Sequence, residues 1–399
     1  MVREPVVEVS AQTARLIDSL GPFATFGTDP ELYAALARPQ ACDFVFGNPH
    51  ELPSPEYVEA LTRGIQPQGP GHYAYKMNEP SATEAIARSL RRRFGVPFER
   101  DDVYLTNGNF SGLSILLHTF SDPGDEIIYV SPPWFFYEAM IVAAGATPVR
   151  TYADRKTFDI DVDAIRSSIT SRTRGIIVNS PNNPSGRIYP KETLDALAAA
   201  LTEASHDQGR PIWLFSDEAY NRIVYEGCEF VSPATRYPWS FLVYTYGKTH
   251  LAPGNRLGYV AVPPSLPGRE ELRVPMMLGQ VTNGWAFPVA PLQHALPMLE
   301  DVSIDVRALQ RRRDALVDAL RSQGYELIEP EGTFYIMVRA PIEDDFAFFK
   351  RLAVYDVFVL PGSTFEMPGW FRISVTANDD MVERGIPGFA KALAETATG

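Results

Sequence analysis

Short apolar runs alternate with longer helical stretches between about residues 80 and 260. The apolar runs predict buried strands, and the longer stretches between them predict helices. Strands are expected at 102–105, 126–130, 173–179, 212–216 and 241–244, and helices at 110–120, 137–144 and 191–204. Continuous apolar strands separated by helices are typical of a mostly parallel sheet that is covered by helices on both faces.

The pattern changes after about residue 285. One long helix is predicted at 291–322, and strands are predicted at 324–327, 334–338, 357–360 and 370–375. These elements indicate a smaller α+β unit. The N-terminal segment is expected to pack with it, because this segment precedes the sheet and has little core of its own. The sequence thus predicts an α/β protein with a large domain at 46–290 and a small domain formed by 1–45 and 291–399.

Composition excludes several classes of protein. The chain has 399 residues, of which 45% are hydrophobic and 21% charged, as is ordinary for a soluble globular protein. Its net charge of -13 argues against binding to nucleic acid, which needs a basic surface. Cys42 and Cys228 indicate neither a disulfide framework nor a zinc site, and no metal is expected. Without a signal peptide or a membrane-length apolar run, a cytoplasmic protein with no membrane partner is predicted.

A lysine at a strand end gives the first indication of chemistry. Lys248 follows the strand predicted at 241–244, and Asp217, Tyr220 and Asn183 precede it in the chain. Catalysis by pyridoxal phosphate (PLP) needs such groups: an amine for a Schiff base, an anion to keep the pyridine nitrogen protonated, and donors to the phenolate oxygen. Asp217 also lies where open α/β sheets bind ligands. Taken singly, Asp217 could cap a helix and 181–186 could be a turn.

The segment 106–112 links a predicted strand to a predicted helix and is a candidate phosphate cradle. Gly108 would allow close approach of an anion, Arg256 could add a bidentate charge, and Thr245 a hydroxyl. Trp134 follows another strand end and could stack on the cofactor ring, or pack in the core. The G-x-G-x-x-G spacing of dinucleotide-binding loops is absent.

These motifs resemble those of the class I/II aminotransferases, which are fold-type-I PLP-dependent enzymes. The strongest matches are Asn-Asn-Pro-Ser-Gly at 182–186, Asp-Glu-Ala-Tyr at 217–220, and Lys248 with Arg256 eight residues later. The resemblance implies PLP as cofactor and a homodimer with shared active sites. It also implies transfer of the amino group of an L-amino acid to a 2-oxo acid through a Lys248 Schiff base and Cα proton transfer.

The resemblance further implies residue roles. The implied catalytic residues are Lys248, Asp217 and Tyr220. The implied cofactor-binding residues are Gly108, Asn109, Phe110, Trp134, Asn183, Asp217, Ala219, Tyr220, Thr245, Lys248, Arg256 and, reaching into the neighbouring subunit, Tyr73. Arg372 is implied to bind the substrate α-carboxylate, together with Asn183 and Gly47.

Three departures from the family pattern leave the substrate open. Gly247 stands where a serine is usual, Tyr75 competes with Tyr73, and 362–370 is shorter than usual. Aromatic residues favour a bulky or apolar substrate side chain, unless they pack in the core and dimer interface: Phe110, Trp134, Phe136, Tyr137, Tyr246 and Trp285. No basic residue is placed to bind a second carboxylate. Elimination, cyclisation or oxidation of an amino acid is the alternative reaction, and a non-catalytic sensor module the remote one.

Overall fold

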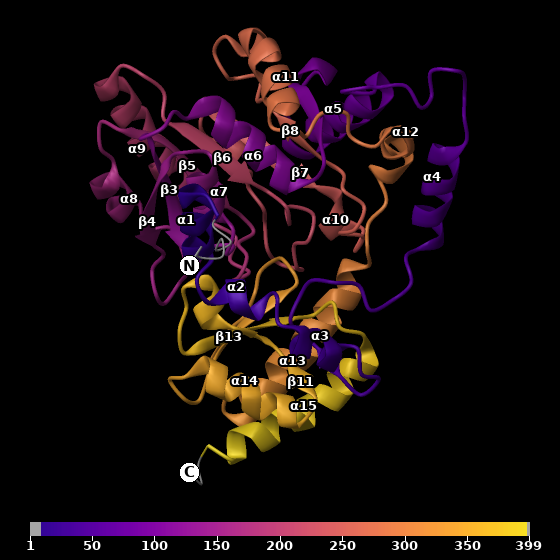
Figure 1. The fold of residues 1–399 in the computed structure, drawn as a ribbon, viewed down its shortest axis with the longest axis vertical. Coiled ribbons are helices and arrows are strands. Elements are labelled where there is room, and N and C mark those ends of the chain that lie inside the picture. The colour runs from indigo at the N-terminus through magenta and orange to yellow at the C-terminus, as the bar shows by residue number, and fades with distance from the viewer. Residues whose placement is uncertain (1–8, 397–399) are drawn as a thin grey trace, which may run out of the picture.

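The computed structural model describes residues 9–396 and consists of a larger unit above a smaller one (Figure 1). A seven-stranded sheet forms the centre of the larger unit, in the order β2-β8-β7-β6-β5-β3-β4. Only β8 runs antiparallel to its neighbours. The strands are β2 (Val103–Thr106), β3 (Glu126–Ser131), β4 (Thr147–Tyr152), β5 (Thr173–Asn179), β6 (Trp213–Asp217), β7 (Ser240–Thr245) and β8 (Gly258–Ala261).

Helices cover both faces of this sheet. Alternate residues of β3 show this: Ile127 and Tyr129 pack on one face, in the same cluster as residues of α6 and α7. Ile128 and Val130 pack on the other face, with residues of α8 and α9. The helices of this unit are α4 (Pro55–Ile65), α5 (Pro80–Phe94), α6 (Asn109–Phe120), α7 (Tyr137–Ala143), α8 (Val162–Ser168), α9 (Lys191–Gln208), α10 (Tyr246–Thr249), α11 (Arg273–Thr282) and α12 (Ala290–Leu299). The mostly parallel, doubly covered sheet predicted from the sequence is therefore confirmed.

The smaller unit is built on an antiparallel sheet in the order β12-β13-β10-β9. Its strands are β9 (Leu327–Ile328), β10 (Tyr335–Arg339), β12 (Leu360–Pro361) and β13 (Trp370–Ser374), and β11 (Val357–Phe358) pairs in parallel with β1 (Cys42–Asp43). Its helices are α13 (Val306–Gln323), α14 (Asp345–Val354) and α15 (Asp379–Ala394).

The prediction of a single helix at 291–322 is wrong. The structure has two helices there, α12 and α13, separated by residues 300–305. Asp305 ends the break, because its side chain accepts a hydrogen bond from the Ala308 backbone N–H and caps the start of α13.

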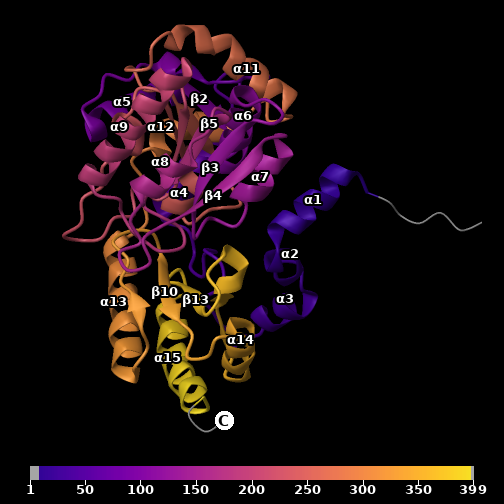
Figure 2. The ribbon, with the colours of Figure 1, turned by 90° about the vertical axis from the view of Figure 1, so that its left-hand side faces the viewer.

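The N-terminal helices run alongside both units (Figure 2). Helix α1 (Ala11–Leu20) packs on α7 of the larger unit, where Gln12 Nε2 donates to the Ala143 carbonyl at 3.0 Å. Helix α2 (Pro22–Phe26) reaches the smaller unit, and α3 (Pro30–Leu36) follows it. The segment thus crosses between the units, and the division into 46–290 and 1–45 with 291–399 stays a prediction. Within residues 9–396, no helix has the length and apolar character needed to cross a membrane.

Candidate active site

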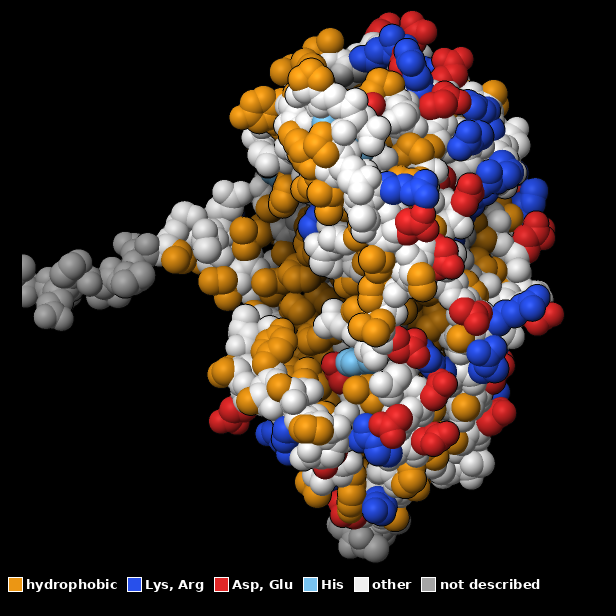
Figure 3. Space-filling view, turned by 90° about the vertical axis from the view of Figure 1, so that its right-hand side faces the viewer, with side chains coloured by type: hydrophobic (Ala, Val, Ile, Leu, Met, Phe, Trp, Pro, Cys, Tyr) orange, Lys and Arg blue, Asp and Glu red, His pale blue; other side chains and the backbone are white. Residues whose placement is uncertain are grey.

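A cavity of 520 Å³ opens between the two units, beyond the carboxyl ends of β5, β6 and β7. In the space-filling view it is an apolar hollow between the upper and lower parts of the molecule (Figure 3). The predicted site residues that line it are Gly47, Asn109, Phe110, Trp134, Asn183, Asp217, Ala219, Tyr220, Thr245, Lys248, Arg256 and Arg372. Parallel strands bring their ends to one edge of the sheet, which explains why residues far apart in sequence meet here.

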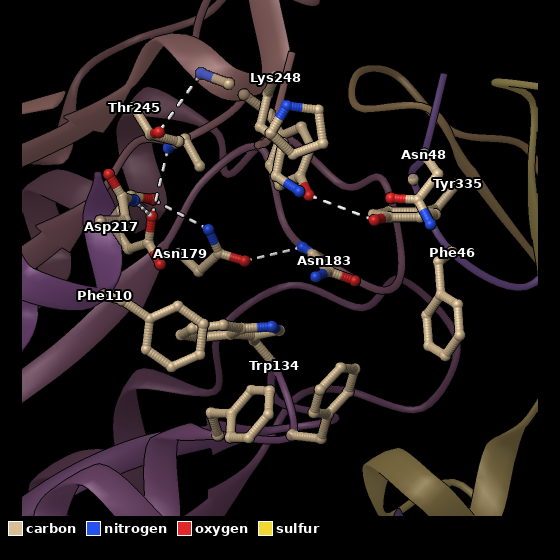
Figure 4. A pocket seen from close by; sticks show the side chains of 18 of the residues that line it. Phe46, Asn48, Phe110, Trp134, Asn179, Asn183, Asp217, Thr245, Lys248 and Tyr335 are labelled. Atoms are coloured by element: carbon tan, nitrogen blue, oxygen red, sulfur yellow. Dashed lines mark hydrogen bonds between the residues drawn. The ribbon is translucent and has the colours of Figure 1, made fainter. Parts of the chain in front are cut away.

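Lys248 enters the cavity from the short helix α10 (Tyr246–Thr249), directly after β7. Figure 4 shows Lys248 among the side chains that line the cavity. Its Nζ lies 5.8 Å from the ring centroids of both Tyr220 and Phe334. No carboxylate of the described chain lies within ion-pairing distance of Nζ. The amine is therefore presented to the cavity beside aromatic walls rather than held on the surface.

Asp217 lies at the end of β6 and is only 4% exposed. Its carboxylate accepts hydrogen bonds from the Tyr137 hydroxyl at 2.6 Å and from the Asn109 amide, besides a backbone N–H. Burial raises the pKa of the Asp217 carboxyl, although these hydrogen bonds and the charge of Lys248 act in the opposite direction. These contacts fix a carboxylate at the cavity wall, where a cationic ring nitrogen would pair with it.

Two asparagines connect the backbone of Asp217 to the opposite side of the cavity. Asn179 Nδ2 donates to the Asp217 carbonyl at 2.9 Å, and Asn179 Oδ1 accepts from the Asn183 N–H at 2.7 Å. Asn183 Oδ1 in turn accepts from Arg372 Nη1 at 2.8 Å. The Asn183 amide nitrogen is therefore left to donate to a ligand.

Arg372 comes from β13 of the smaller unit and is only 2% exposed. Its Nη2 donates to the Val45 carbonyl at 3.0 Å, its Cζ lies 3.8 Å from the Tyr335 ring centroid, and its buried Nε has no partner. Burial lowers the pKa of Arg372, and no carboxylate within residues 9–396 pairs with it. A buried guanidinium without an anion is costly unless a ligand supplies one, so this position suits a substrate carboxylate.

Gly108 begins the turn into α6 with φ of +81°, a conformation that favours glycine. A Cβ there would lie 2.7 Å from Arg256 Nη2 and 3.4 Å from Thr245 Oγ1. The glycine thus keeps a space between a helix N-terminus, a guanidinium and a hydroxyl. That set of donors fits a phosphate group.

Tyr335 is a cavity residue that sequence reasoning missed. Its hydroxyl lies 3.4 Å from that of Tyr220. Burial opposes ionisation of Tyr335, but the charges of Arg372 and Lys248 outweigh it and lower its pKa, whereas burial raises the pKa of Tyr220 well above its usual value. Tyr335 sits in the apolar run of β10, which indicated only a core strand, so no local signal pointed to it.

The predicted aromatic residues divide into two groups. Phe110, Trp134 and Phe136 line the cavity, and Tyr137 lies behind it on Asp217. Tyr246 and Trp285 do not line the cavity, as the alternative of core or surface packing had allowed: the Tyr246 hydroxyl contacts Glu300, and Trp285 is partly exposed, with its carbonyl accepting from the Asn107 amide at 3.4 Å.

Tyr73 does not line the cavity of its own chain. Its side chain is 56% exposed, and its hydroxyl contacts the Ile65 carbonyl. Tyr75, the alternative, is 88% exposed and lies against Phe287, with ring centroids 5.0 Å apart. Neither tyrosine is among the residues that line the cavity of this chain.

Comparison with known proteins agrees with this geometry. The model of the family described as aminotransferase class I and II matches residues 42–388. The chain belongs to this family. An aspartate/prephenate aminotransferase of Thermus thermophilus is 32% identical over 395 residues, covering 95% of this aminotransferase and 98% of the relative. A probable aspartate/prephenate aminotransferase of Thermus aquaticus is 31% identical, covering 94% and 98%.

Solved structures share the architecture over nearly the whole chain. An aminotransferase of Eubacterium rectale superposes with a TM-score of 0.88 at 30% identity, covering 98% of this chain and 99% of that one. An aspartate aminotransferase of Thermotoga maritima superposes with a TM-score of 0.83 at 25% identity, covering 97% and 100%. The fold-type-I prediction is confirmed, and the protein is a PLP-dependent aminotransferase whose substrates are amino acids and 2-oxo acids.

Proposed function

We propose that this aminotransferase moves the amino group of an L-amino acid to a 2-oxo acid with Lys248 as the reacting amine. One observation supports this best. Three cations that have no ion pair in the described chain, Lys248, Arg256 and Arg372, face one cavity. The buried carboxylate of Asp217 faces the same cavity. This set matches an aldehyde that needs an amine, a phosphate and a carboxylate that need cations, and a ring nitrogen that needs an anion.

The donors around the cavity fit PLP. The N–H groups at the start of α6, from Gly108 to Phe110, would hold its phosphate with Thr245 and Arg256. Lys248 would hold the aldehyde, and Asp217 would face the ring nitrogen. The Asn183 amide and the Tyr220 hydroxyl would donate to the phenolate oxygen, while Trp134 and Ala219 flank the ring. Bound there, the cofactor supplies a sink for the electron pair left when the Cα–H bond of an amino acid breaks.

The remaining roles fall to the chain's own residues. Arg372 would bind the substrate carboxylate in a fixed fork, close to the Asn183 amide. Gly47 lets the backbone pack closely against two rings at this end of the cavity, because a Cβ there would clash with Phe334 Cε2 and lie 2.9 Å from the Tyr335 hydroxyl. Lys248, once its amine is free, would take the proton from the substrate Cα and deliver it to the carbon that was the aldehyde of the cofactor.

The proposal is tested by following the amino group through one turnover. Holoenzyme mixed with an amino acid should yield one equivalent of 2-oxo acid without ammonia, and a second 2-oxo acid should then receive the amino group. Mass spectrometry with ¹⁵N-labelled donor measures this transfer. Free ¹⁵N-ammonia in stoichiometric amount would instead indicate elimination or oxidation.

In the same assay, Arg372→Lys should lower the kcat/KM of every amino-acid substrate by a similar factor. It keeps the charge but loses the bidentate geometry, so kcat/KM should fall by about 10²-fold, roughly 3 kcal/mol, across substrates. A loss confined to one amino acid would show that Arg372 contacts a side chain rather than the α-carboxylate.

A dicarboxylic amino acid is a second candidate substrate. The names of the two Thermus relatives, at 31–32% identity, favour it.

The location of the protein in the cytoplasm stays a prediction.

We also infer a homodimer with shared active sites. Exposed apolar side chains gather on α11 and the segment after it, on one side of the larger unit: Val274, Met277, Leu278, Val281, Trp285, Phe287 and Val289 (Figure 3). Tyr75 packs against this surface and Tyr73 lies nearby in sequence. Covering such a surface removes apolar area from water and would carry a tyrosine toward the partner's phosphate site.

Light scattering of the holoenzyme should give twice the 44.3 kDa chain mass. Met277→Glu places a charge on this surface and should shift the protein toward monomer with loss of activity. Val354→Glu is the matched control, because Val354 is an exposed apolar residue of α14 in the smaller unit. A monomeric, active wild-type protein would refute the shared site.

A further inference from the structure

One side of the cavity is a wall of aromatic rings contributed by separate segments. Phe23 comes from α2, Tyr33 from α3, Phe46 from the segment after β1, and Phe135 and Phe136 from the turn before α7. These five residues are called the aromatic wall below. The N-terminal helices thus complete the cavity as well as connecting the two units.

The wall is formed by rings packed on rings. Phe23 stacks on Phe135 with centroids 3.8 Å apart and meets Phe136 edge-on at 5.4 Å. Tyr33 stacks on Phe46 at 6.5 Å, and its hydroxyl already donates to the Gly27 carbonyl at 2.9 Å. The wall therefore offers ring faces and edges to the cavity.

The wall lies where a substrate side chain has to go. Phe46 directly follows Val45, whose carbonyl accepts from Arg372. In the close view, Phe46 lies on the side of the cavity away from Asp217, with Lys248 between them (Figure 4). An amino acid with its carboxylate at Arg372 and its Cα at Lys248 has this side left for its side chain.

Within the described residues, this chain places no charge at the aromatic wall that could pair with a charged side chain. The cations that line the cavity are Lys248, Arg256 and Arg372, and each already has a role; Asp217 is the carboxylate among the described lining residues. A second carboxylate or an ammonium at the aromatic wall would be desolvated without a partner from this chain.

We propose that the aromatic wall is the side-chain subsite and that the amino donor is an aromatic L-amino acid; this rests on the proposed function. Aromatic rings pair with one another at centroid distances of about 4.5–7 Å, in stacked or edge-to-face geometry. The wall already uses both geometries, and Tyr33 and the neighbouring Phe110 are still partly exposed. The ring of an aromatic substrate can pack against these rings in the same geometries. An alkyl side chain would occupy the same space without making ring–ring contacts.

The test is a comparison of amino donors with the holoenzyme, with the 2-oxo acid measured as product. Phenylalanine, tyrosine and tryptophan should exceed aspartate, glutamate, lysine and alanine in kcat/KM by about 100-fold. Faster conversion of aspartate or lysine overturns the aromatic subsite and leaves the aminotransferase assignment of Lys248 intact. Failure of every amino acid to lose its amino group overturns the proposed function itself.

Two wall variants and one control separate a subsite from a merely structural role. Phe23→Ala and Phe136→Ala should lower kcat/KM for phenylalanine by about 10-fold and leave that for alanine within about twofold. Phe26→Ala is the control, because Phe26 lies on the same helix but packs on Phe346 and Phe349 of α14. The aromatic wall does not select the substrate side chain if Phe26→Ala gives the same selective loss. The same conclusion follows if the two wall variants lower kcat/KM for alanine as much as for phenylalanine.

Discussion

Lys248→Ala is expected to lower turnover by at least about 10⁴-fold, a rise in the barrier of roughly 5 kcal/mol. The variant removes both the amine that would hold the aldehyde and the base that would move the Cα proton. No other described cation lining the cavity can replace it, since both Arg256 and Arg372 are guanidinium groups. The measurement is the rate of 2-oxo acid formation by protein reconstituted with PLP.

The fold should survive this substitution. Lys248 contacts the rings of Tyr220 and Phe334 at 5.8 Å and has no ion-pair partner in the described chain, so the free energy of unfolding should change by about 1 kcal/mol or less. Circular dichroism during heating checks this. The surface variant Lys350→Ala should keep full activity. Near-normal turnover of Lys248→Ala would place the reacting amine on another residue.

Most of the central sheet could be predicted because five of its strands are continuous apolar runs. Of the two missed strands, β4 lacks that signal, because it lies at the sheet edge, contains Pro148 and Arg150, and is largely solvent-accessible. β8 has an apolar run, but the run is short and begins at a glycine, and no helix separates it from β7 other than the single turn of α10. Such strands form because a neighbouring strand is already there to pair with, and pairing between distant segments is not visible in a local pattern.

The candidate site follows the same rule. Lys248, Asp217 and Asn183 could be predicted because each belongs to a short motif at a strand end. Tyr335 and Phe23 could not, since their neighbours along the chain are ordinary core or helix residues and only tertiary packing brings them to the cavity. The break between α12 and α13 was hidden for a related reason, because charged residues continue a helical pattern as readily as they interrupt it.

Asp217→Asn should lower turnover by about 10³-fold, roughly 4 kcal/mol in the barrier. Asparagine keeps the shape but removes the charge that would hold a proton on the ring nitrogen. It also places a donor where the carboxylate now accepts from Asn109 or Tyr137, so one of these two hydrogen bonds has to rearrange. The cofactor should still bind through the phosphate cradle, and its visible absorption band should shift because the ring nitrogen loses its proton.

Glu218→Gln is the matched control, because Glu218 is the next residue in the chain and is also fully buried. Its carboxylate accepts from Ser216 and Ser232 at 3.0 and 2.5 Å, away from the cavity. Replacing it should cost stability through lost buried hydrogen bonds, about 1–3 kcal/mol, while turnover per folded molecule stays near normal. Asp217→Asn should show the reverse, with a modest change in unfolding and a large change in rate. If the two variants lost activity in proportion to stability, Asp217 would be a structural carboxylate and another group would meet the ring nitrogen.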